Sequence, residues 1–441
     1  MDSRKTVVIL MLPYRSHYRA SFDYANFLKS QGKRVIYLGS ETIRDIVVNE
    51  KFEFHAMYHL FDREMTNVKS FLGILIRCVS DPCFKIRNYR TFYSSYLEIK
   101  KFMKRYNPAE IYLDEGYSEY CWFFREFKAV IKLLNPNLST TKVPGVPPLD
   151  SPYVPQVSWW SDVLCEFLWS MNFVKLKSIE FINRIAFLGH DELTFWKRFC
   201  SKRGWNWEQG IEWNHSFYRC MTGIETIILG PKALEFARKT RIATETYFHQ
   251  RTHKSEVKYL TDAYLNFMSA LERRFRDPKF RLIYYTFGTQ GELNHKRENK
   301  LLIKLMECIR HEPNMFLVIS DADPEHQKFN YANIRILSFV PHKHFLPYAD
   351  IVISHGDICV IKDCLDESVP MIIYPLSLVG ASASYANRIQ ALGLGLAGSI
   401  DVCTPKSIRQ NIYDLVHEKR FINSKLLTAA HASLHKVLRH A

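Results

Sequence analysis

The sequence predicts an α/β protein with two doubly wound parallel sheets. Short apolar runs of the length of buried strands alternate with amphipathic segments of helical length in both halves of the chain. In each half, a strand also leads through a short turn into a helix, which is typical of a βαβ unit. We expect two domains that face each other across a cleft, with ligands at the carboxyl ends of the strands.

The N-terminal half opens with a βαβ unit. We expect a strand at residues 6–12, a turn at 13–17, a helix at 18–32 and a second strand at 34–39. Gly32 suits the left-handed position that follows the last turn of a helix.

The rest of this half is less regular. A strand at 110–115 follows a helical stretch that ends near Asn107. Residues 143–158 are rich in proline and are predicted to be irregular. Helical, aromatic sequence then continues to about residue 220.

The C-terminal half repeats the alternation of strands and helices. The first predicted elements are strands at 281–288, 315–320 and 333–339, with a helix at 298–311. Two further helices, at 407–420 and 423–440, end the chain.

The most informative stretch lies between these elements. A buried strand at 351–354 passes through the turn His355-Gly356-Asp357 into a helix at 358–367, and a second buried strand follows at 370–376. A strand that feeds a helix through a short turn presents free backbone N–H groups and the positive end of a helix dipole at one point. The sequence therefore predicts an anion site at this turn.

Composition limits the kinds of partner. Lys and Arg number 60 against 45 Asp and Glu, so the net charge is +15 and anionic partners are expected. No zinc-finger or aromatic RNA-binding pattern accompanies this charge, so we expect no nucleic acid partner. The ten cysteines are scattered without a CxxC pair, which indicates reduced thiols in the cytoplasm. No apolar run approaches the roughly 20 residues of a membrane span, so membrane contact would be peripheral.

All eight tryptophans lie between Trp122 and Trp213. They could form an aromatic core. Alternatively, they could line an apolar acceptor pocket or a lip that touches lipid, because Trp suits boundaries between water and apolar groups. The pair Trp159-Trp160 stands beside prolines and favours the second interpretation, so we predict that it binds the acceptor.

Four motifs of the C-terminal half resemble the UDP-glycosyltransferase family, whose members have the two-domain GT-B fold. Family members carry W-x-P-Q-x-x-x-L, H-G-G-x-x-S-x-x-E, G-V-P before a proline-ended strand, and D-Q with an N-A pair. The matching residues here are Phe339-Val340-Pro341-His342 with Leu346, His355-Gly356-Asp357 through Asp363, Ser368-Val369-Pro370 with Pro375, and Ala386-Asn387.

The resemblance implies that these residues bind a nucleoside diphosphate sugar, with UDP as the nucleotide. Phe339 would stack on the base, and His342 would bond to the base or ribose. His355 and the start of the helix at Ile358 would hold the pyrophosphate. Asp363 would accept hydrogen bonds from the ribose hydroxyls. The further donor-binding residues predicted are Gly288, Thr289, Gly356, Asp357, Ser384 and Asn387.

The chain departs from the family pattern at three places. Asp357 stands where a glycine is expected, so its carboxylate would either repel the phosphates or cap the following helix. Val360 replaces a serine that reaches a phosphate oxygen. The D-Q pair is absent, and Ala383-Ser384 stands at the nearest spacing.

The resemblance also supplies a candidate base. Family members carry P-x-x-x-H at the first strand-to-helix turn, and Pro13 to His17 fit that spacing. An imidazole can accept the proton of an acceptor hydroxyl near neutral pH. Asp114, at the end of the strand at 110–115, resembles the family's partner carboxylate, with Glu115 as its nearest rival.

We therefore predict an inverting, metal-independent glycosyltransferase without a cofactor, which moves a sugar from a UDP-sugar to a hydroxyl of a small apolar or lipid-like acceptor. Residues 1–230 would bind the acceptor and 281–441 the nucleotide sugar, with a linker and first helix at 231–280. The protein would be cytoplasmic, with peripheral membrane contact. The alternatives are a catalytically degraded helper or binding subunit, and a sugar-nucleotide epimerase that uses Asp357 and Asp363.

Overall fold

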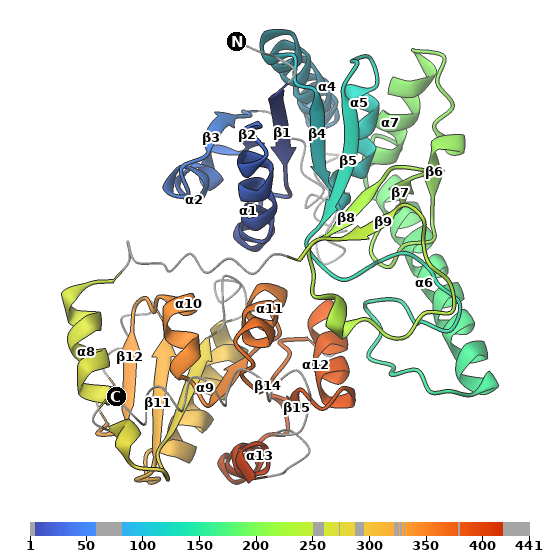
Figure 1. Cartoon of the computed structure of the whole chain (residues 1–441). Coiled ribbons are helices and arrows are strands. Elements are labelled where there is room, and N and C mark those ends of the chain that lie inside the picture. Colours follow the sequence, from blue (N-terminus) through green and yellow to red (C-terminus); the bar gives the residue numbers. More distant parts are fainter. Residues whose placement is uncertain are drawn as a thin grey trace. The chain divides into compact units, whose positions relative to one another are not determined.

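A computed structural model of the chain (Figure 1) describes residues 5–58, 82–249, 260–272, 274–286, 295–321, 326, 329, 331–377 and 380–417. The chain divides into two compact units. The first comprises Met1–Leu149, Pro155–Lys232 and Ala237–Gln250, and the second comprises Asp150–Val154, Ala233–Phe236 and Arg251–Ala441.

The first unit is built on a sheet of seven strands in the order β3-β2-β1-β4-β5-β8-β9. Every pairing in this sheet is parallel. The strands are β1 (Thr6–Leu10), β2 (Arg34–Gly39), β3 (Glu53–Ala56), β4 (Glu110–Asp114), β5 (Val130–Asn135), β8 (Thr226–Ile228) and β9 (Glu245–Tyr247).

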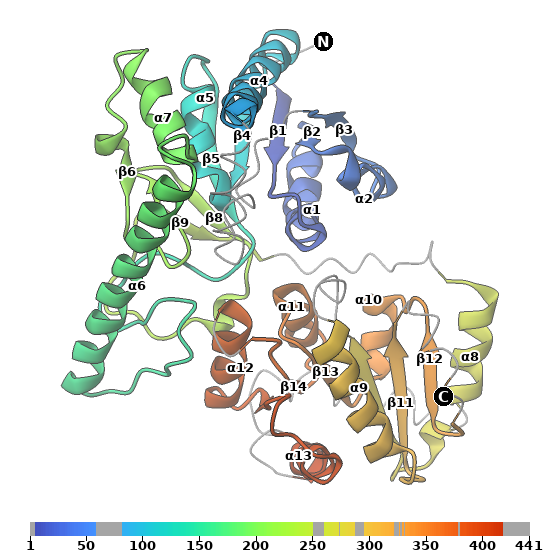
Figure 2. The same ribbon diagram turned by 180° about the vertical axis from the view of Figure 1, so that it is seen from behind.

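Helices cover both faces of this sheet (Figures 1 and 2). The helices of this unit are α1 (Arg15–Ser30), α2 (Arg44–Asn49), α4 (Pro82–Tyr106), α5 (Cys121–Phe124), α7 (Glu192–Ser201) and α6 (Trp159–Ala186), of which α6 extends beyond the sheet. Alternate strand residues enter two different cores: Val8 and Leu10 pack with α4, α5 and α7, whereas Val7 and Ile9 pack with α1 and α2. This alternation is the period-two side-chain pattern of a strand that is buried on both faces. A short antiparallel hairpin, β6 (Ile211–Glu212) and β7 (Cys220–Met221), completes the unit.

The second unit repeats the plan with six parallel strands in the order β12-β11-β10-β13-β14-β15. The strands are β10 (Arg281–Thr286), β11 (Met315–Ser320), β12 (Ile334–Leu337), β13 (Ile351–Ser354), β14 (Met371–Ile373) and β15 (Gly395–Ala397). The helices are α8 (Asp262–Glu272), α9 (His295–Ile309), α10 (His342–Phe345), α11 (Ile358–Asp366), α12 (Ala381–Ala391) and α13 (Pro405–His417). Leucines and isoleucines of α9 and α13 share one core with β10 and β11.

The predicted fold class of two doubly wound parallel sheets is confirmed. Residues 143–158 contain no helix or strand, as expected from their prolines. Two local predictions were wrong. The helix α1 begins at Arg15, three residues before the predicted start, so His17 lies in the first turn of the helix. The stretch predicted to be helical to about residue 220 has its last α-helix end at Ser201 and then forms the hairpin of β6 and β7. The strand β9 joins the first sheet although it follows residue 230 in the sequence. The predicted helix at 423–440 lies outside the described residues.

In the described part of the chain, no helix combines the length and the apolar character that crossing a membrane requires.

Candidate active site

Each sheet has one point at which the strand order reverses. In the first sheet this point lies between β1 and β4, and in the second it lies between β10 and β13. Connections leave such neighbouring strands toward opposite faces of the sheet, which opens a crevice at their carboxyl ends. The residues predicted to act as base and to hold pyrophosphate follow these strands, so each unit, taken by itself, contains one candidate site.

His17 follows β1 in the first turn of α1. Tyr14 is the residue before this helix, and its ring lies 5.3 Å from the His17 ring, measured between centroids. The His17 side chain is 20% exposed, so one edge of the imidazole reaches solvent.

Asp114 is the last residue of β4 and is completely buried. Its Oδ1 accepts a hydrogen bond from the Gly116 N–H at 2.9 Å, and its Oδ2 accepts one from the Leu12 N–H at 3.3 Å. Oδ2 also lies 2.6 Å from Nδ1 of His17. Backbone N–H groups on both oxygens fix the orientation of the carboxylate.

This arrangement selects one tautomer of His17. An ionised carboxylate only accepts hydrogen bonds, so Nδ1 must carry the proton that points at Asp114. Nε2 then holds a lone pair and can accept a proton, as the base of a His-Asp pair does.

Glu115, the rival of Asp114, contacts different groups. Its carboxylate accepts hydrogen bonds from the hydroxyls of Thr140 and Tyr218 at 3.0 Å, and Nδ1 of His215 lies 3.6 Å from one of its oxygens. Burial raises the pKa of Glu115 to about 7, although His215 and the two hydroxyls act in the opposite direction. Asp114, and not Glu115, is therefore the carboxylate that contacts His17.

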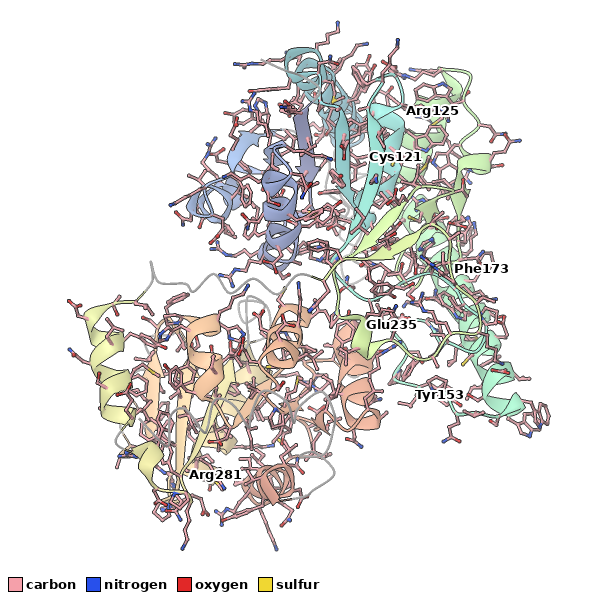
Figure 3. All side chains as sticks on the ribbon, viewed as in Figure 1. Cys121, Arg125, Tyr153, Phe173, Glu235 and Arg281 are labelled. Atoms are coloured by element: carbon pink, nitrogen blue, oxygen red, sulfur yellow. The ribbon has the colours of Figure 1, made fainter. Side chains whose placement is uncertain are left out.

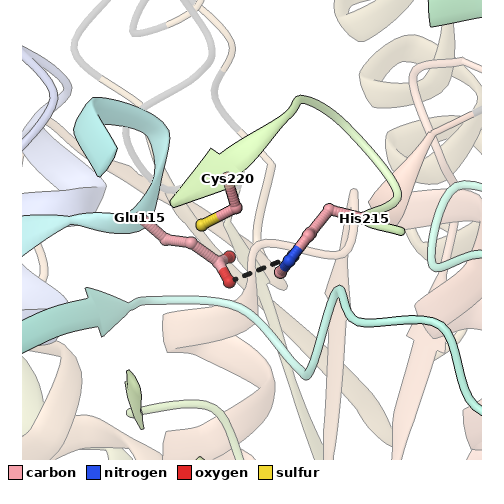
Figure 4. A group of neighbouring side chains, drawn as sticks. All are labelled: Glu115, His215 and Cys220. Atoms are coloured by element: carbon pink, nitrogen blue, oxygen red, sulfur yellow. Dashed lines mark ion pairs between the residues drawn. The ribbon is translucent and has the colours of Figure 1, made fainter. Parts of the chain in front are cut away.

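Glu115 also belongs to a group of three potential metal ligands, with His215 and Cys220 (Figure 4). Their ligand atoms lie within 4.8 Å of one another, and they form the one such group in the described ranges. The Thr140 hydroxyl lies among them, 3.0 Å from both Glu115 oxygens and from Nδ1 of His215. Burial raises the pKa of the Cys220 thiol well above its usual value, whereas a metal-bound cysteine is a thiolate. The Thr140 hydroxyl thus links Glu115 and His215 by hydrogen bonds.

At the turn after β13, the backbone of Gly356 passes close to Ile373 and Ser382. Gly356 has φ +93°, and a Cβ built on it would lie 3.0 Å from Cγ2 of Ile373 and 3.2 Å from Cβ of Ser382. Its N–H donates to Oγ of Ser354 at 3.2 Å. His355 is buried beside it, and burial lowers the pKa of its imidazole, so the ring is neutral near pH 7.

Asp357 caps the helix that follows. It has extended backbone angles and accepts a hydrogen bond from the Cys359 N–H at 2.8 Å, while α11 begins at Ile358 as predicted. Of the two interpretations of Asp357, the capping role is therefore observed. The same carboxylate places a negative charge at the predicted anion site.

Of the other predicted donor residues, His342 and Asp363 lie close together. Nε2 of His342 is 3.5 Å from Oδ2 of Asp363, and the His342 ring lies against Tyr284 with 5.6 Å between centroids. Phe339 is 47% exposed. Gly288 and Thr289, also predicted to bind the donor, lie outside the described residues.

Ser384 and Asn387 make internal contacts in the second unit. Oγ of Ser384 accepts a hydrogen bond from Nε of the buried Arg388 at 3.3 Å. Nδ2 of Asn387 donates to the Pro152 carbonyl at 2.6 Å. Both side chains, predicted to bind the donor, therefore already serve the packing of α12.

Arg388 extends this packing to a second segment. It donates to the Leu234 carbonyl at 2.9 Å and lies 3.9 Å over the Phe236 ring. Through these contacts with α12, two short segments, Asp150–Val154 and Ala233–Phe236, belong to the second unit. Figure 3 labels one residue of each segment, Tyr153 and Glu235. Such a segment has no periodic pattern, so sequence reasoning did not predict it.

The tryptophans include both buried and exposed side chains. Trp122 and Trp196 are buried in the core of the first unit. Trp159 and Trp160 are more than half exposed at the start of α6, with their rings stacked 3.8 Å apart.

No family profile and no curated protein sequence matches this chain.

The whole chain is nevertheless similar to solved structures of glycosyltransferases. The glycotransferase of kitacinnamycin superposes with a TM-score of 0.65 at 14% identity, covering 99% of this chain and 96% of that one. The spinosyn forosaminyltransferase SpnP gives 0.60 at 14% identity, with 99% and 94% covered. The glycosyltransferase VinC in complex with DTDP gives 0.56 at 14% identity, with 98% and 95% covered. Together with the two doubly wound sheets, these similarities show that the chain has the GT-B fold.

Proposed function

We propose that this protein is an inverting glycosyltransferase. It would transfer a sugar from a pyrimidine nucleoside diphosphate to a hydroxyl of a small apolar or lipid-like acceptor. The observation that carries the proposal is the His17–Asp114 pair at the switch point of the first sheet. A partly exposed imidazole contacts a buried carboxylate whose two oxygens each accept a backbone hydrogen bond.

The chemical step uses the chain's own groups as follows. Nε2 of His17 takes the proton of the acceptor hydroxyl while that oxygen attacks the anomeric carbon of the sugar. The bond between this carbon and the diphosphate oxygen breaks, and its electron pair leaves with the nucleotide. Asp114 stabilises the imidazolium that forms. Attack from the side opposite the leaving group inverts the anomeric centre.

The second unit would bind the donor at the turn after β13. Backbone N–H groups at the start of α11, the imidazole of His355 and the close approach at Gly356 suit a pyrophosphate. Phe339 would stack on the base, while His342 and Asp363 would bond to the ribose. The sequence resemblance favours UDP, whereas VinC was solved with DTDP. UDP and TDP are both pyrimidine nucleoside diphosphates, and we propose both as candidates for the donor nucleotide.

We also propose a cytoplasmic location with peripheral membrane contact. The apolar acceptor is supported by the exposed indoles of Trp159 and Trp160 at the start of α6. A strongly polar acceptor, such as a free sugar, would contradict this part of the proposal.

One alternative is favoured by specific observations. Asp357 caps α11 with a carboxylate, and Ser384 and Asn387 are engaged in packing. These features would suit a helper subunit that has lost its donor. Such a subunit would have no use for the His17–Asp114 pair, so we rank this function second.

A thermal-shift titration with UDP, TDP, GDP and NAD tests the donor site first. A ligand that binds only the native state raises the melting temperature, so we expect a rise with UDP or TDP and none with NAD. No rise with any nucleotide would favour the helper subunit.

The bound nucleotide then selects the sugar donors for a transfer assay. His17→Ala should abolish transfer while the nucleotide-induced thermal shift persists, because His17 belongs to the first unit. The matched control is His190→Ala, on the surface of the same unit, which should leave transfer unchanged. Full turnover by His17→Ala would overturn the proposed base.

A further inference from the structure

Helix α6 has two apolar faces, although it packs with only one of them. On its inner side, Cys165, Trp169, Leu176 and Ala186 are buried. The Trp169 indole donates to the Val146 carbonyl at 2.8 Å, which fixes this side against the rest of the first unit.

The other face forms a continuous exposed stripe. The apolar residues of this stripe are each between 38% and 65% exposed: Trp160, Leu164, Phe167, Met171, Val174, Phe181 and Ile185. Their spacing alternates between four and three residues once Ser178 is included, so they lie in one row along the helix. At 1.5 Å per residue the row is about 38 Å long.

The charges on α6 are arranged unevenly around this stripe. The acidic residues Asp162, Glu166 and Glu180 are paired with Lys239, Lys142 and Arg219, respectively. The positions that flank the stripe contain three exposed basic residues, Lys175, Lys177 and Arg184, and no acidic residue. The stripe is therefore bordered by positive charge on both sides.

We propose that this face of α6 docks the protein on an anionic lipid bilayer. An interfacial helix buries an apolar stripe to about 5–10 Å in the boundary between headgroups and acyl chains, while lysines and arginines beside it contact lipid phosphates. The stacked indoles of Trp159 and Trp160 suit this boundary, because the indole ring is apolar and its N–H group is polar. The net charge of +15 adds long-range attraction.

A second copy of the chain fits this surface less well. The alternating spacing would also suit a pair of helices, in which residues beside the seam commonly form ion pairs of opposite charge. Here the residues beside the seam are basic, apolar or hydroxyl-bearing: Ser161, Val163, Leu168, Ser170, Lys175, Lys177, Ile182 and Arg184. Because none is acidic, neither a parallel nor an antiparallel pair would complement the basic residues.

Cosedimentation of the full chain with vesicles tests the proposal. We expect binding to phosphatidylcholine vesicles that contain phosphatidylserine, little binding to phosphatidylcholine alone, and loss of binding as salt rises. The apolar variant is Phe167→Ser with Phe181→Ser, and the charge variant is Lys175→Glu with Arg184→Glu. Each should weaken binding about tenfold or more.

The controls separate docking from folding and from chemistry. Ile303→Ser with Val402→Ser removes two similarly exposed apolar side chains from the second unit and should bind like the wild type. All four changes on α6 are at exposed positions, and melting temperatures will show whether they fold. His17→Ala should also bind vesicles normally, so failure of the proposed chemistry would leave this result intact.

Three results would overturn the proposal. These are no binding to anionic vesicles, equal binding to neutral and anionic vesicles, and a dimer in solution that Phe167→Ser with Phe181→Ser converts to a monomer. The last result would assign the stripe to a second copy of the chain.

Discussion

Nδ1 of His17 and Oδ2 of Asp114 lie 2.6 Å apart although 97 residues separate them in the sequence. The contact arises because β1 and β4 are neighbours in the first sheet, in parallel register from Val7 and Glu110 to Leu10 and Leu113. Both residues therefore emerge from the same edge of the sheet. Backbone N–H groups hold both oxygens of Asp114, so the pair is preorganised by the fold.

The first prediction concerns the tautomer of His17. In Asp114→Asn, an amide oxygen that keeps the 2.9 Å bond from the Gly116 N–H gives up the longer 3.3 Å bond from the Leu12 N–H, and the amide NH2 then faces Nδ1 of His17. A donor facing Nδ1 favours the tautomer with its proton on Nε2, which cannot act as a base. We expect transfer to fall about 10²- to 10⁴-fold, with nucleotide binding unchanged, in steady-state assays.

Asp45→Asn is the matched control for this substitution. Asp45 is an exposed acid in the same unit, and its carboxylate contacts Arg15 at 3.3 Å. This variant should keep nearly all transfer activity. Equal activity of Asp114→Asn and wild type would show that the carboxylate does not select the tautomer.

Much of the fold could be predicted because its strands are short apolar runs. The strands β1, β2, β4, β10, β11, β12, β13 and β14 all fall within predicted ranges. In contrast, β5 was not predicted, because Lys132 interrupts its apolar run and Val130 is exposed. The strand β15 contains only three residues, Gly395–Ala397, and a glycine-rich stretch does not have a strand pattern.

The candidate site was predictable where a residue follows a strand. His17 and Asp114 lie at the carboxyl ends of two neighbouring parallel strands of the first sheet, and His355 follows a strand of the second sheet. The partners of Ser384 and Asn387 were not predictable, because they depend on Arg388 and on a carbonyl of Pro152. Contacts with irregular segments distant in sequence leave no periodic signal.

The second prediction is a pH dependence of stability caused by Glu115. Burial raises the pKa of its carboxyl to about 7 in the folded protein. Between about pH 4.5 and about pH 7, the native state retains a proton that the unfolded chain has lost, so stability falls as pH rises through this range. In Glu115→Gln this fall should be smaller, and the variant should gain stability relative to wild type as pH rises.

Tryptophan fluorescence during urea unfolding is the measurement. All eight tryptophans belong to the first unit, so the signal reports the unit that contains Glu115. Glu166→Gln, at an exposed position on α6, is the control and should keep the wild-type profile. Parallel pH profiles for Glu115→Gln and wild type would contradict the prediction.

The third prediction separates backbone strain from crowding at the turn that follows β13. Gly356→Ala adds a Cβ at φ +93°, and that atom would lie 3.0 Å from Ile373. Gly393→Ala adds a Cβ at φ +68° with nothing within 4 Å. We expect Gly393→Ala to cost about 1 kcal/mol and Gly356→Ala about 1–3 kcal/mol of stability.

Hydrogen exchange of peptides from the second unit measures both effects, since tryptophan fluorescence reports only the first. Gly356→Ala should also weaken nucleotide binding, whereas Gly393→Ala should not. Equal losses of stability in the two variants would show that crowding at Gly356 adds nothing to the cost of backbone strain.

The fourth prediction concerns the charge that Asp357 places at the start of α11. Asp357→Asn keeps a good N-cap, since an amide oxygen can accept the Cys359 N–H as the carboxylate does. It removes the negative charge near the predicted diphosphate, so repulsion of about 1 kcal/mol disappears. We expect UDP or TDP to bind about fivefold more tightly in calorimetric titrations, with a change in stability below about 1 kcal/mol.

Two comparisons make this result specific to the cap. Asp366→Asn removes the same charge from the other end of α11 and should leave the affinity nearly unchanged. Asp357→Ala removes both charge and cap, so it should cost about 1 kcal/mol of stability. Weaker nucleotide binding by Asp357→Asn would mean that the carboxylate helps to hold the ligand, for example by accepting a hydrogen bond from a ribose hydroxyl. The departure from the family's glycine would then be an adaptation of the donor site, and the helper-subunit function would lose one of its supporting observations.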